Sequence, residues 1–178
     1  MNRAEENLAA GTVEQRFERE AMPHLRGLIG TATRIMGDRG RAEDVVQDVF
    51  LQAWKSFERF ETGTNCRAWL YKILFHCIHH YRRKWFRFAV MQPMDDYTEA
   101  TAAYTPPIPE RLTDEDLLAA LDKIPSDFRA VILLVDVEEF AYKEAADILS
   151  VPIGTVMSRL SRGRKAMREL LVAKEAGR

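Results

Sequence analysis

The chain has little cysteine and no long apolar run, and each shortage excludes a class of protein. Only two of its 178 residues are cysteines, Cys66 and Cys77, too few for the disulfide framework of a small secreted domain. No stretch approaches the roughly 18 consecutive apolar residues of a membrane-spanning helix, and no signal-peptide pattern appears at the N-terminus. We therefore expect a cytoplasmic protein without membrane insertion.

The residue patterns of enzymes are also missing. The sequence has no phosphate-binding loop, no pair of carboxylates arranged for catalysis and no nucleophile motif. His76, Cys77, His79 and His80 cluster, and His76 and His80 are spaced to share one metal ion on a helix. No second ligand pair accompanies them, so we favour a core cysteine with surface histidines over a metal or redox site. We expect no enzyme activity, no cofactor and no metal.

Strand-like alternation and internal repeats are absent, whereas helical spacing is frequent. Apolar residues recur at steps of three and four over residues 17–35, 42–57 and 69–81. Residues 92–109 contain four prolines, which favour extended chain. The sequence predicts an all-α fold in which two small helical modules are joined by a Pro-rich linker. We expect a tail over residues 1–13, a first module over 14–90, the linker over 91–112 and a second module over 113–175.

Local signals predict several helix boundaries. Pro23 interrupts the first apolar series, so we expect a kink or a new helix start there. A second helix is expected over about 41–56. Asn65 is suited to cap a third helix, with Trp69, Ile73, Cys77 and Tyr81 as its buried stripe. In the second module Thr113 can cap a helix whose expected buried residues are Leu117, Leu118 and Leu121.

Charge is sorted along the chain, although its net value is only −1. Residues 62–94 hold six basic and no acidic side chains, and residues 153–178 hold seven basic and two acidic ones. Residues 95–152 between them hold four basic and fourteen acidic side chains. Two separate basic blocks indicate contact with a polyanion at two places. The acidic block can mask basic surface in the free protein at low salt.

The second module has the pattern of a helix-turn-helix. We expect a helix over 142–149, a turn over 150–152 and a long helix over 153–171, with Pro152 tolerated where that helix opens. Its core stripe is expected at Val156, Leu160, Gly163, Met167 and Leu170. The opposite face presents Thr155, Ser158, Arg159, Arg162 and Lys165. Hydroxyls followed by arginines favour entry into the major groove of duplex DNA, and a basic helix for protein docking is the alternative.

The basic block of the first module is interleaved with aromatic residues. Its cations are Arg67, Lys72, Arg82, Arg83, Lys84 and Arg87, and its aromatics are Trp69, Tyr71, Phe75, Tyr81, Trp85, Phe86 and Phe88. Cations that follow a backbone, with rings on which bases stack, are typical of single-stranded DNA binding. Some of these rings must be core, because Trp69 and Tyr81 lie on the apolar stripe. Stacking and core packing therefore stay open as alternatives.

The loop of Thr62, Gly63, Thr64 and Asn65 before this helix is suited to receive an unstacked base. Gly63 permits unusual backbone angles, and the side chains of Thr64 and Asn65 can pair with a base edge. Arg67 and Lys72 can then hold phosphates, and Tyr71 can supply a stacking face. The alternative is that Asn65 only caps the helix.

Three stretches of sequence, in this order, carry a resemblance to a known family. They are AEDVVQDVFLQAW over residues 42–54, FETGTNCRAWLYKI over 60–73 and VPIGTVMSRLSRGR over 151–164. From about Phe17 to Leu171 the chain resembles the extracytoplasmic-function sigma factors of bacteria. The resemblance implies that the first module docks on core RNA polymerase and melts the minus-ten element. It implies that the second module reads the minus-thirty-five element as duplex DNA, and that an anti-sigma factor is a further partner.

The resemblance also assigns roles by position. It implies that Asp44, Gln47 and Asp48 lie on the helix that meets the polymerase clamp, and that Ser158, Ser161 and Arg162 are recognition-helix positions. Together with the cations above, the expected minus-ten residues are Thr62, Gly63, Thr64, Asn65, Arg67, Tyr71, Lys72, Arg82 and Arg83. The expected minus-thirty-five residues are Thr155, Ser158, Arg159, Ser161, Arg162 and Lys165. A helix-turn-helix regulator without sigma activity is the alternative, but it does not explain the acid-free aromatic stretch.

Overall fold

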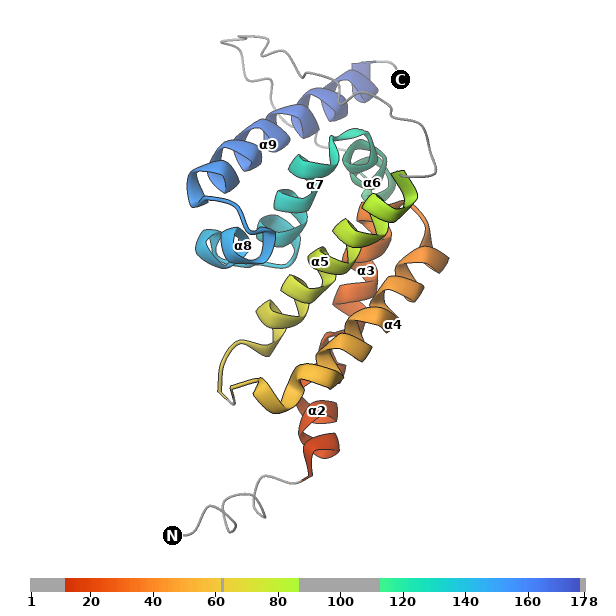
Figure 1. Cartoon of the computed structure of the whole chain (residues 1–178). Coiled ribbons are helices and arrows are strands. Elements are labelled where there is room, and N and C mark those ends of the chain that lie inside the picture. The colour runs from red at the N-terminus through yellow and green to blue at the C-terminus, as the bar shows by residue number, and fades with distance from the viewer. Residues whose placement is uncertain (1–11, 62, 87–112, 177–178) are drawn as a thin grey trace. The chain divides into compact units, whose positions relative to one another are not determined.

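The computed structural model describes residues 12–61, 63–86 and 113–176, and Figure 1 shows their helices. They form two compact units, the first built chiefly from residues 12–82 and the second chiefly from residues 113–146 and 151–176. The described ranges contain helices and no strand, so the all-α prediction is confirmed. Within those ranges no helix combines the length and the apolar character needed to span a membrane. The predicted linker over 91–112 lies outside the described residues.

The first unit begins with two helices separated at Pro23. Helix α2 (Val13–Ala21) is followed by a 3-10 turn, η1 (Met22–His24), and by α3 (Leu25–Met36). Thr12 caps α2 through a reciprocal pair of hydrogen bonds with Gln15. The new helix start predicted at Pro23 is therefore confirmed.

Helix α4 (Arg39–Ser56) packs along α3 and runs into the 3-10 turn η2 (Phe57–Arg59). It begins two residues earlier than predicted, because the Asp38 carboxylate accepts a hydrogen bond from the Arg41 backbone N–H at 2.7 Å and caps it. The predicted face of Ala42, Val46, Val49, Ala53 and Phe57 is buried. This face forms one side of the core of the first unit.

A chain of aromatic rings continues that core. The ring centroid of Phe57 lies 5.1 Å from that of Phe17 and 5.6 Å from that of Phe60, and Phe60 lies 4.8 Å from Trp69. These contacts join α2 and η2 to α5 (Cys66–Phe86). Trp69 is therefore a packing residue, as its place on the apolar stripe suggested.

The buried face of α5 differs from the predicted stripe. The buried residues are Cys66, Leu70, Tyr71, Leu74, Cys77 and Ile78, whereas Trp69, Ile73 and Tyr81 are half-buried. A helix has 3.6 residues per turn, so a series of strict four-residue steps drifts around its axis. Mixed steps of three and four keep to one face. The strict i+4 stripe was wrong for this reason.

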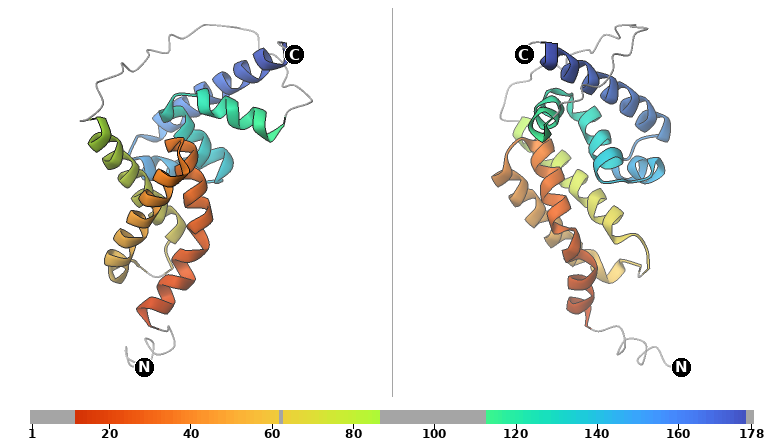
Figure 2. Two further views of the ribbon diagram at one scale, coloured as in Figure 1. Left: turned by 90° about the vertical axis from the view of Figure 1, so that its right-hand side faces the viewer. Right: turned by 180° about the vertical axis from the view of Figure 1, so that it is seen from behind.

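The second unit contains the predicted helix-turn-helix. Helix α6 (Asp114–Lys123) precedes α7 (Ser126–Ile132), which continues into a π-helical segment, η3 (Leu133–Val137). Helix α8 (Tyr142–Leu149) has the predicted bounds, and α9 (Ile153–Ala176) begins where predicted and extends further. Figure 2 shows that α9 lies alongside α6 and α7.

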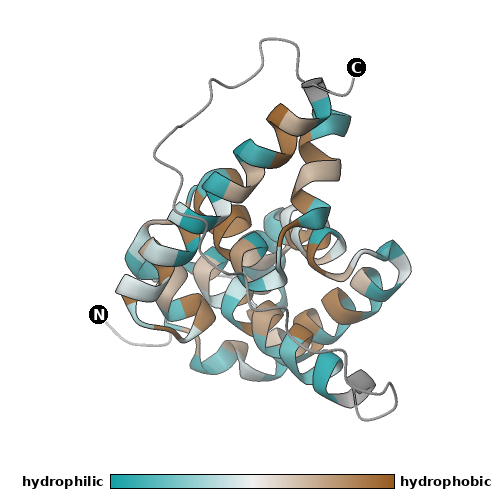
Figure 3. Cartoon of the chain, turned by 90° about the horizontal axis from the view of Figure 1, so that it is seen from above, coloured by the Kyte–Doolittle hydropathy of each residue, from teal (hydrophilic) through white to brown (hydrophobic). Residues whose placement is uncertain are grey.

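Gly163 allows α9 to approach α7 closely. A Cβ atom at Gly163 would lie 2.9 Å from the Ile132 Cδ1 atom and 3.2 Å from the Phe128 Cβ atom. The predicted core stripe is buried at Val156, Leu160 and Gly163 and only half-buried at Met167 and Leu170. Figure 3 shows hydrophobic and hydrophilic residues alternating along the helices, as amphipathic packing requires.

The buried face of α6 also differs from the prediction. Leu121 is buried, but Leu117 and Leu118 are exposed, and Asp116 is buried instead. The Asp116 carboxylate accepts hydrogen bonds from Thr113 and pairs with the Lys174 ammonium of α9 at 2.5 Å. The buried side of α6 thus holds Asp116, Ala120 and Leu121, and the two leucines lie on its solvent side.

Candidate nucleic-acid interfaces

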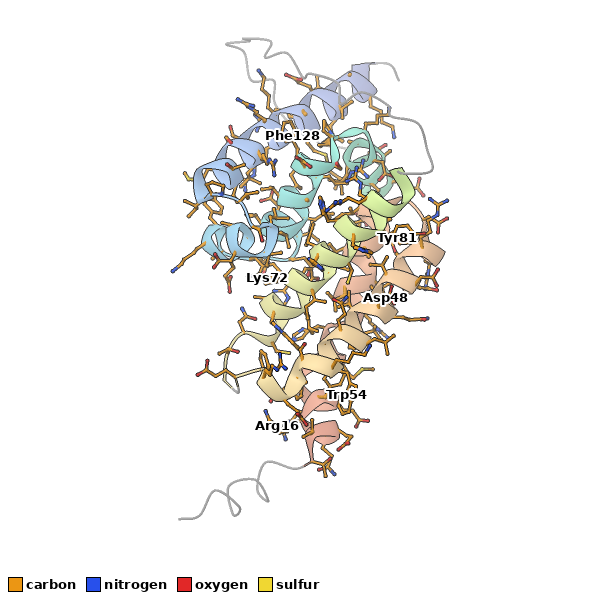
Figure 4. The ribbon with its side chains drawn as sticks, viewed as in Figure 1. Arg16, Asp48, Trp54, Lys72, Tyr81 and Phe128 are labelled. Carbon is orange, nitrogen blue, oxygen red and sulfur yellow. The ribbon has the colours of Figure 1, made fainter. Side chains whose placement is uncertain are left out.

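Helix α4 carries a mixed polar and apolar face opposite its core face. Asp44, Gln47 and Asp48 are exposed on it. Leu51, with 56% of its surface exposed, and Trp54, with 40%, continue the same face at helical spacing. Figure 4 shows Asp48 and Trp54 on this helix. An exposed aliphatic residue and an exposed indole among charged groups suit a protein partner better than a nucleic acid.

Leu51 and Trp54 were not identified from the sequence as functional residues. The exposure of Leu51 could have been predicted from helical spacing, because Leu51 does not lie on the same face as the buried residues Ala42, Val46, Val49 and Ala53. Two exposed apolar residues one turn apart on the polar side of an amphipathic helix, as Leu51 and Trp54 are, form a small patch that suits a docking surface.

The loop before α5 has the backbone geometry predicted for it. Gly63 has a φ of +89°, a conformation that favours glycine. The Thr64 hydroxyl donates to the Glu61 carbonyl at 2.7 Å, and the Asn65 side-chain oxygen accepts from the Ala68 backbone N–H at 3.0 Å. The capping role of Asn65 is therefore confirmed. All three residues are exposed, and Thr62 lies outside the described residues.

The cations of α5 differ in exposure. Lys72, Arg82 and Arg83 are exposed, and Figure 4 shows Lys72 on this helix. Arg67 is half-buried, with its guanidinium carbon 5.6 Å from the centroid of the Tyr71 ring. Tyr71 itself is only 1% exposed. The structure contradicts the stacking role predicted for Tyr71, because its ring lies on the buried face of the helix and offers no surface to a base.

The exposed face of α5 combines cations with histidines. Lys72, His76, His79 and Arg83 follow one another at steps of four, three and four, and all four are exposed. Cys77 is buried, with its sulfur 3.6 Å from the Gln52 side-chain oxygen. Within the described ranges, no group of three or more His, Cys, Asp or Glu residues is arranged to hold a metal ion. By spacing and exposure, Lys72, His76, His79 and Arg83 form a basic stripe along the helix.

Helix α9 presents most of the residues predicted to read duplex DNA. Ser158, Ser161, Arg162 and Lys165 are exposed, and Thr155 is half-buried. The Ser158 hydroxyl donates to the Thr155 carbonyl at 3.1 Å. Its oxygen lone pairs, rather than its proton, face a ligand in the free protein.

Carboxylates of the acidic block pair with arginines of α9. Arg159 lies 2.8 Å from Asp127, and Arg164 lies 2.5 Å from one oxygen of Asp136 and 3.1 Å from the other. The hydrogen bonds to Asp136 raise the pKa of Arg164. Masking of basic surface by the acidic block, as the charge pattern predicted, is therefore seen at two residues. Arg159 is thus already paired with a carboxylate in the free protein.

A hollow lies between α8 and the exposed side of α9. It is lined by Tyr142, Met157, Leu160, Ser161, Arg164, Lys165 and Arg168. Sequence reasoning missed Tyr142, Met157, Arg164 and Arg168, although the last three are spaced around Ser161 at helical intervals. A concave surface with three cations, of which Arg164 is paired with Asp136, suits the phosphates of a nucleic acid.

Comparison with known proteins finds a sigma-factor relative for each of the two units. Family models of sigma-70 region 2 and sigma-70 region 4 match residues 21–87 and 114–167. The ECF RNA polymerase sigma factor SigE of Mycolicibacterium smegmatis is 34% identical over 153 residues, which are 83% of this chain and 58% of that protein. The ECF RNA polymerase sigma factor EcfG of Rhodopseudomonas palustris is 34% identical over 151 residues, which are 85% of this chain and 81% of the relative. The chain thus spans somewhat more than half of the first relative and most of the second.

Solved structures agree with these relatives. The sigma factor RpoE of Bartonella quintana, in complex with the anti-sigma factor NepR, is 34% identical with a TM-score of 0.71, covering 88% of this chain and 97% of its own. CnrH, in complex with the cytosolic domain of CnrY, shares the fold with a TM-score of 0.63 at 23% identity, covering 93% of this chain and 92% of its own. The resemblance found in the sequence is confirmed. The chain belongs to the extracytoplasmic-function sigma factors of the sigma-70 type.

Proposed function

We propose that this chain is an alternative sigma factor that joins core RNA polymerase, directs it to specific promoters and helps to melt the minus-ten element. One observation carries the proposal. The same chain holds two different surfaces suited to DNA. Helix α5 of the region-2 unit has a basic stripe, and α9 of the region-4 helix-turn-helix exposes Ser158, Ser161, Arg162 and Lys165. A factor that binds melted and duplex DNA with different units needs both surfaces. Action on polymerase and promoter implies that it works in the cytoplasm.

Docking on polymerase is assigned to the exposed face of α4. Asp44, Gln47 and Asp48 supply polar contacts there, and Leu51 and Trp54 supply apolar area. Interfaces between proteins combine a small apolar centre with a polar rim. The face of α4 has both parts, which supports a protein partner at this place.

Binding of the melted minus-ten strand is assigned to the loop before α5 and to the cations of that helix. Gly63, Thr64 and Asn65 are exposed at the start of α5, so they are accessible to a base that has left the stack. Extrusion of a base costs a few kcal/mol, and a loop that receives it lowers that cost. Lys72, Arg82 and Arg83, with Arg67, supply positive charge for the phosphates.

Reading of the minus-thirty-five element is assigned to α9. Ser158, Ser161, Arg162 and Lys165 are exposed on the helix that follows the turn. In a helix-turn-helix, that helix enters the major groove with its N-terminal residues at the base edges. Thr155 and Arg159 are half-buried and take part at the margin, Arg159 only after it leaves Asp127.

We propose that an anti-sigma protein is a further partner. The Bartonella quintana relative was solved with such a partner, and both units of this chain expose apolar side chains. Leu51 and Trp54 lie on α4, and Leu117 and Leu118 lie on α6. A partner that covers the α4 face would compete directly with polymerase.

The test is transcription in vitro with core polymerase on a library of promoter fragments. We expect discrete transcripts only when this chain and core are both present, and loss of them with the double variant Gln47→Ala, Asp48→Ala. The matched control, Glu58→Ala with Arg59→Ala, changes exposed polar residues of η2 and should leave transcription unchanged. A plain helix-turn-helix regulator would bind duplex DNA without core and give no core-dependent transcript, and that result would overturn the proposal.

A further inference from the structure

Met157 occupies an unusual place on the recognition helix. It is 53% exposed in the second turn of α9, where a helix-turn-helix meets base edges. Its neighbours on the exposed face are Ile153, itself 50% exposed, and the small residues Gly154, Ser158 and Ser161. At Gly154 even a Cβ atom would find nothing within 4 Å. Met157 is therefore the longest side chain among these neighbours.

A single exposed apolar residue is ordinary on a protein surface. Whether Met157 has a role in binding therefore depends on the residues around it. It lines the same hollow as Arg164, Lys165 and Arg168. These cations lie two to three turns further along α9. Lys165 and Arg168 suit phosphates of the DNA backbone, and Arg164 can join them once it leaves Asp136. A helix held at that end by phosphates directs its N-terminal turns, and Met157 with them, into the groove.

The chemistry of the major groove restricts what an apolar side chain can contact there. Every base edge presents hydrogen-bond donors or acceptors, and thymine alone adds an apolar group, its C5-methyl. A methionine placed against guanine, cytosine or adenine would remove water from polar groups without replacing their hydrogen bonds. Against thymine it buries a methyl group, and its flexible thioether can adjust to the fit.

We infer that Met157 reads a thymine methyl group, so that the minus-thirty-five element of this factor contains a thymine opposite Met157. The inference rests on the proposed function and adds to it a feature of the promoter sequence. Ser158 does not compete for this contact, because its hydroxyl already donates to the Thr155 carbonyl. Met157 was absent from the residues expected to read DNA, because the sequence drew attention to hydroxyls and cations only.

The test removes one methyl group at a time. A promoter is first obtained by in vitro transcription, and each thymine of its minus-thirty-five element, on either strand, is replaced by deoxyuridine. Binding of the holoenzyme to each duplex is then measured by competition against the unmodified promoter. We expect one position at which the wild-type holoenzyme binds about threefold to fourfold more weakly, the effect of burying one methyl group.

Two variants connect that effect to Met157. Met157→Leu keeps an apolar side chain and should keep the sensitivity to deoxyuridine. Met157→Gln has a similar length but a polar end, and it should bind the two duplexes equally. Thermal unfolding and assembly with core polymerase serve as controls. Unfolding should be unchanged because Met157 is exposed, and assembly should be unchanged because the docking face is assigned to α4.

Three results would overturn the inference. The wild type can be insensitive to every deoxyuridine, or Met157→Gln can keep the full sensitivity. Met157→Gln can also weaken assembly with core while the ratio between the two duplexes stays as in the wild type, which would assign Met157 to a protein contact. Failure of the proposed function is distinct, because the wild type would then give no promoter-dependent transcript, and the inference would fall with it.

Discussion

Asp136 and Arg164 form a two-point ion pair that joins the π-helical segment η3 to the recognition helix α9. The guanidinium of Arg164 lies 2.5 Å from one carboxylate oxygen and 3.1 Å from the other. Both side chains are partly exposed, 30% for Asp136 and 53% for Arg164, so the pair contributes less than about 1 kcal/mol to stability. The pair matters chiefly for DNA binding. Arg164 lines the hollow beside α9, and its ion pair with Asp136 competes with any phosphate for the guanidinium.

Asp136→Asn should therefore strengthen non-specific binding to duplex DNA. Without the carboxylate, Arg164 is available to a phosphate, and the slope of log affinity against log salt should steepen by up to about one. Fluorescence anisotropy of the full chain on a duplex, measured over a series of salt concentrations, gives both the affinity and its salt slope. Asp122→Asn is the control, because it removes the same charge but Asp122 pairs with Arg129 of α7. Equal changes in the two variants would leave only an effect of net charge.

Leu51→Ser should weaken assembly with core polymerase without weakening the fold. Leu51 is exposed, so the substitution should change the free energy of unfolding by no more than about 0.5 kcal/mol. If Leu51 lies at the apolar centre of the docking face, its loss should reduce affinity for core by about tenfold. Met22→Ser replaces another exposed apolar residue of the same unit and should assemble normally. Normal assembly of Leu51→Ser would remove Leu51 from the interface.

The buried carboxylate of Asp116 should make the second unit sensitive to acid. Hydrogen bonds from Lys174, and then from Thr113, hold the pKa of Asp116 well below its ordinary range. A lowered pKa in the folded state means that this contribution to stability is complete above the unfolded value of about 3.9. It is lost progressively as the pH falls below that value.

The corresponding measurement is thermal unfolding between pH 7 and pH 2.5. Asp116→Asn should melt lower than the wild type at pH 7, and the difference should shrink toward pH 2.5, because the Asp116 carboxylate then takes up a proton in the unfolded chain while it stays ionised in the folded one. Asp114→Asn, an exposed residue of the same first turn, should show no comparable difference at either end. A difference between Asp116→Asn and the wild type that stays constant with pH would contradict the role of this ionisation.

The parts of the fold that were predicted correctly depend on local chemistry. The bounds of α8, the turn and the start of α9 follow from helical spacing and from Pro152, all within a short segment. Caps at Asn65 and Thr113 are equally local, because each residue bonds to a backbone N–H three residues on. Signals of this kind do not depend on the rest of the molecule.

The parts that were predicted incorrectly depend on contacts between distant segments. Leu118 is exposed, and Asp116 is buried and paired with Lys174 of α9, a contact that spacing within α6 does not reveal. Likewise, the sequence offered Arg159 as a DNA contact, but not its pairing with Asp127 of α7. Charge patterning predicted that acids would mask bases, and only the packed structure identifies which pairs form.

Both cysteine thiols should be unreactive in the native protein. Burial, and then the Glu20 carboxylate, raise the pKa of Cys66 to about 11, and burial and then Asp48 raise the pKa of Cys77. Since the thiolate is the reactive form, a disulfide reagent at pH 7.5 should label the native chain slowly and the chain in guanidinium rapidly. The two residues lie three turns apart on α5, about 16 Å along its axis, too far for a disulfide. Rapid labelling of the native chain would show that a thiol is accessible.

Asn65 has a confirmed structural role, so its proposed role in promoter melting needs a variant that separates the two. Its side-chain oxygen accepts the Ala68 N–H at 3.0 Å and caps α5. Asn65→Asp keeps an acceptor at that place, and a negative charge at a helix N-terminus is favourable, so the melting temperature should be preserved. Asn65→Ala removes the cap and should reduce the free energy of unfolding by about 1 kcal/mol.

Asn65→Asp should therefore be the more stable of the two variants, yet it should still be impaired in promoter opening. If the loop receives a base, Asn65→Asp replaces an amide by a carboxylate that faces DNA, and it should impair open-complex formation despite its stability. Permanganate reactivity of the minus-ten thymines in the holoenzyme complex measures opening. On a promoter with a pre-melted minus-ten bubble, a variant that fails only to open the duplex should recover, whereas one that no longer binds the base should not. Normal opening by a stable Asn65→Asp protein would leave the cap as the sole role of Asn65.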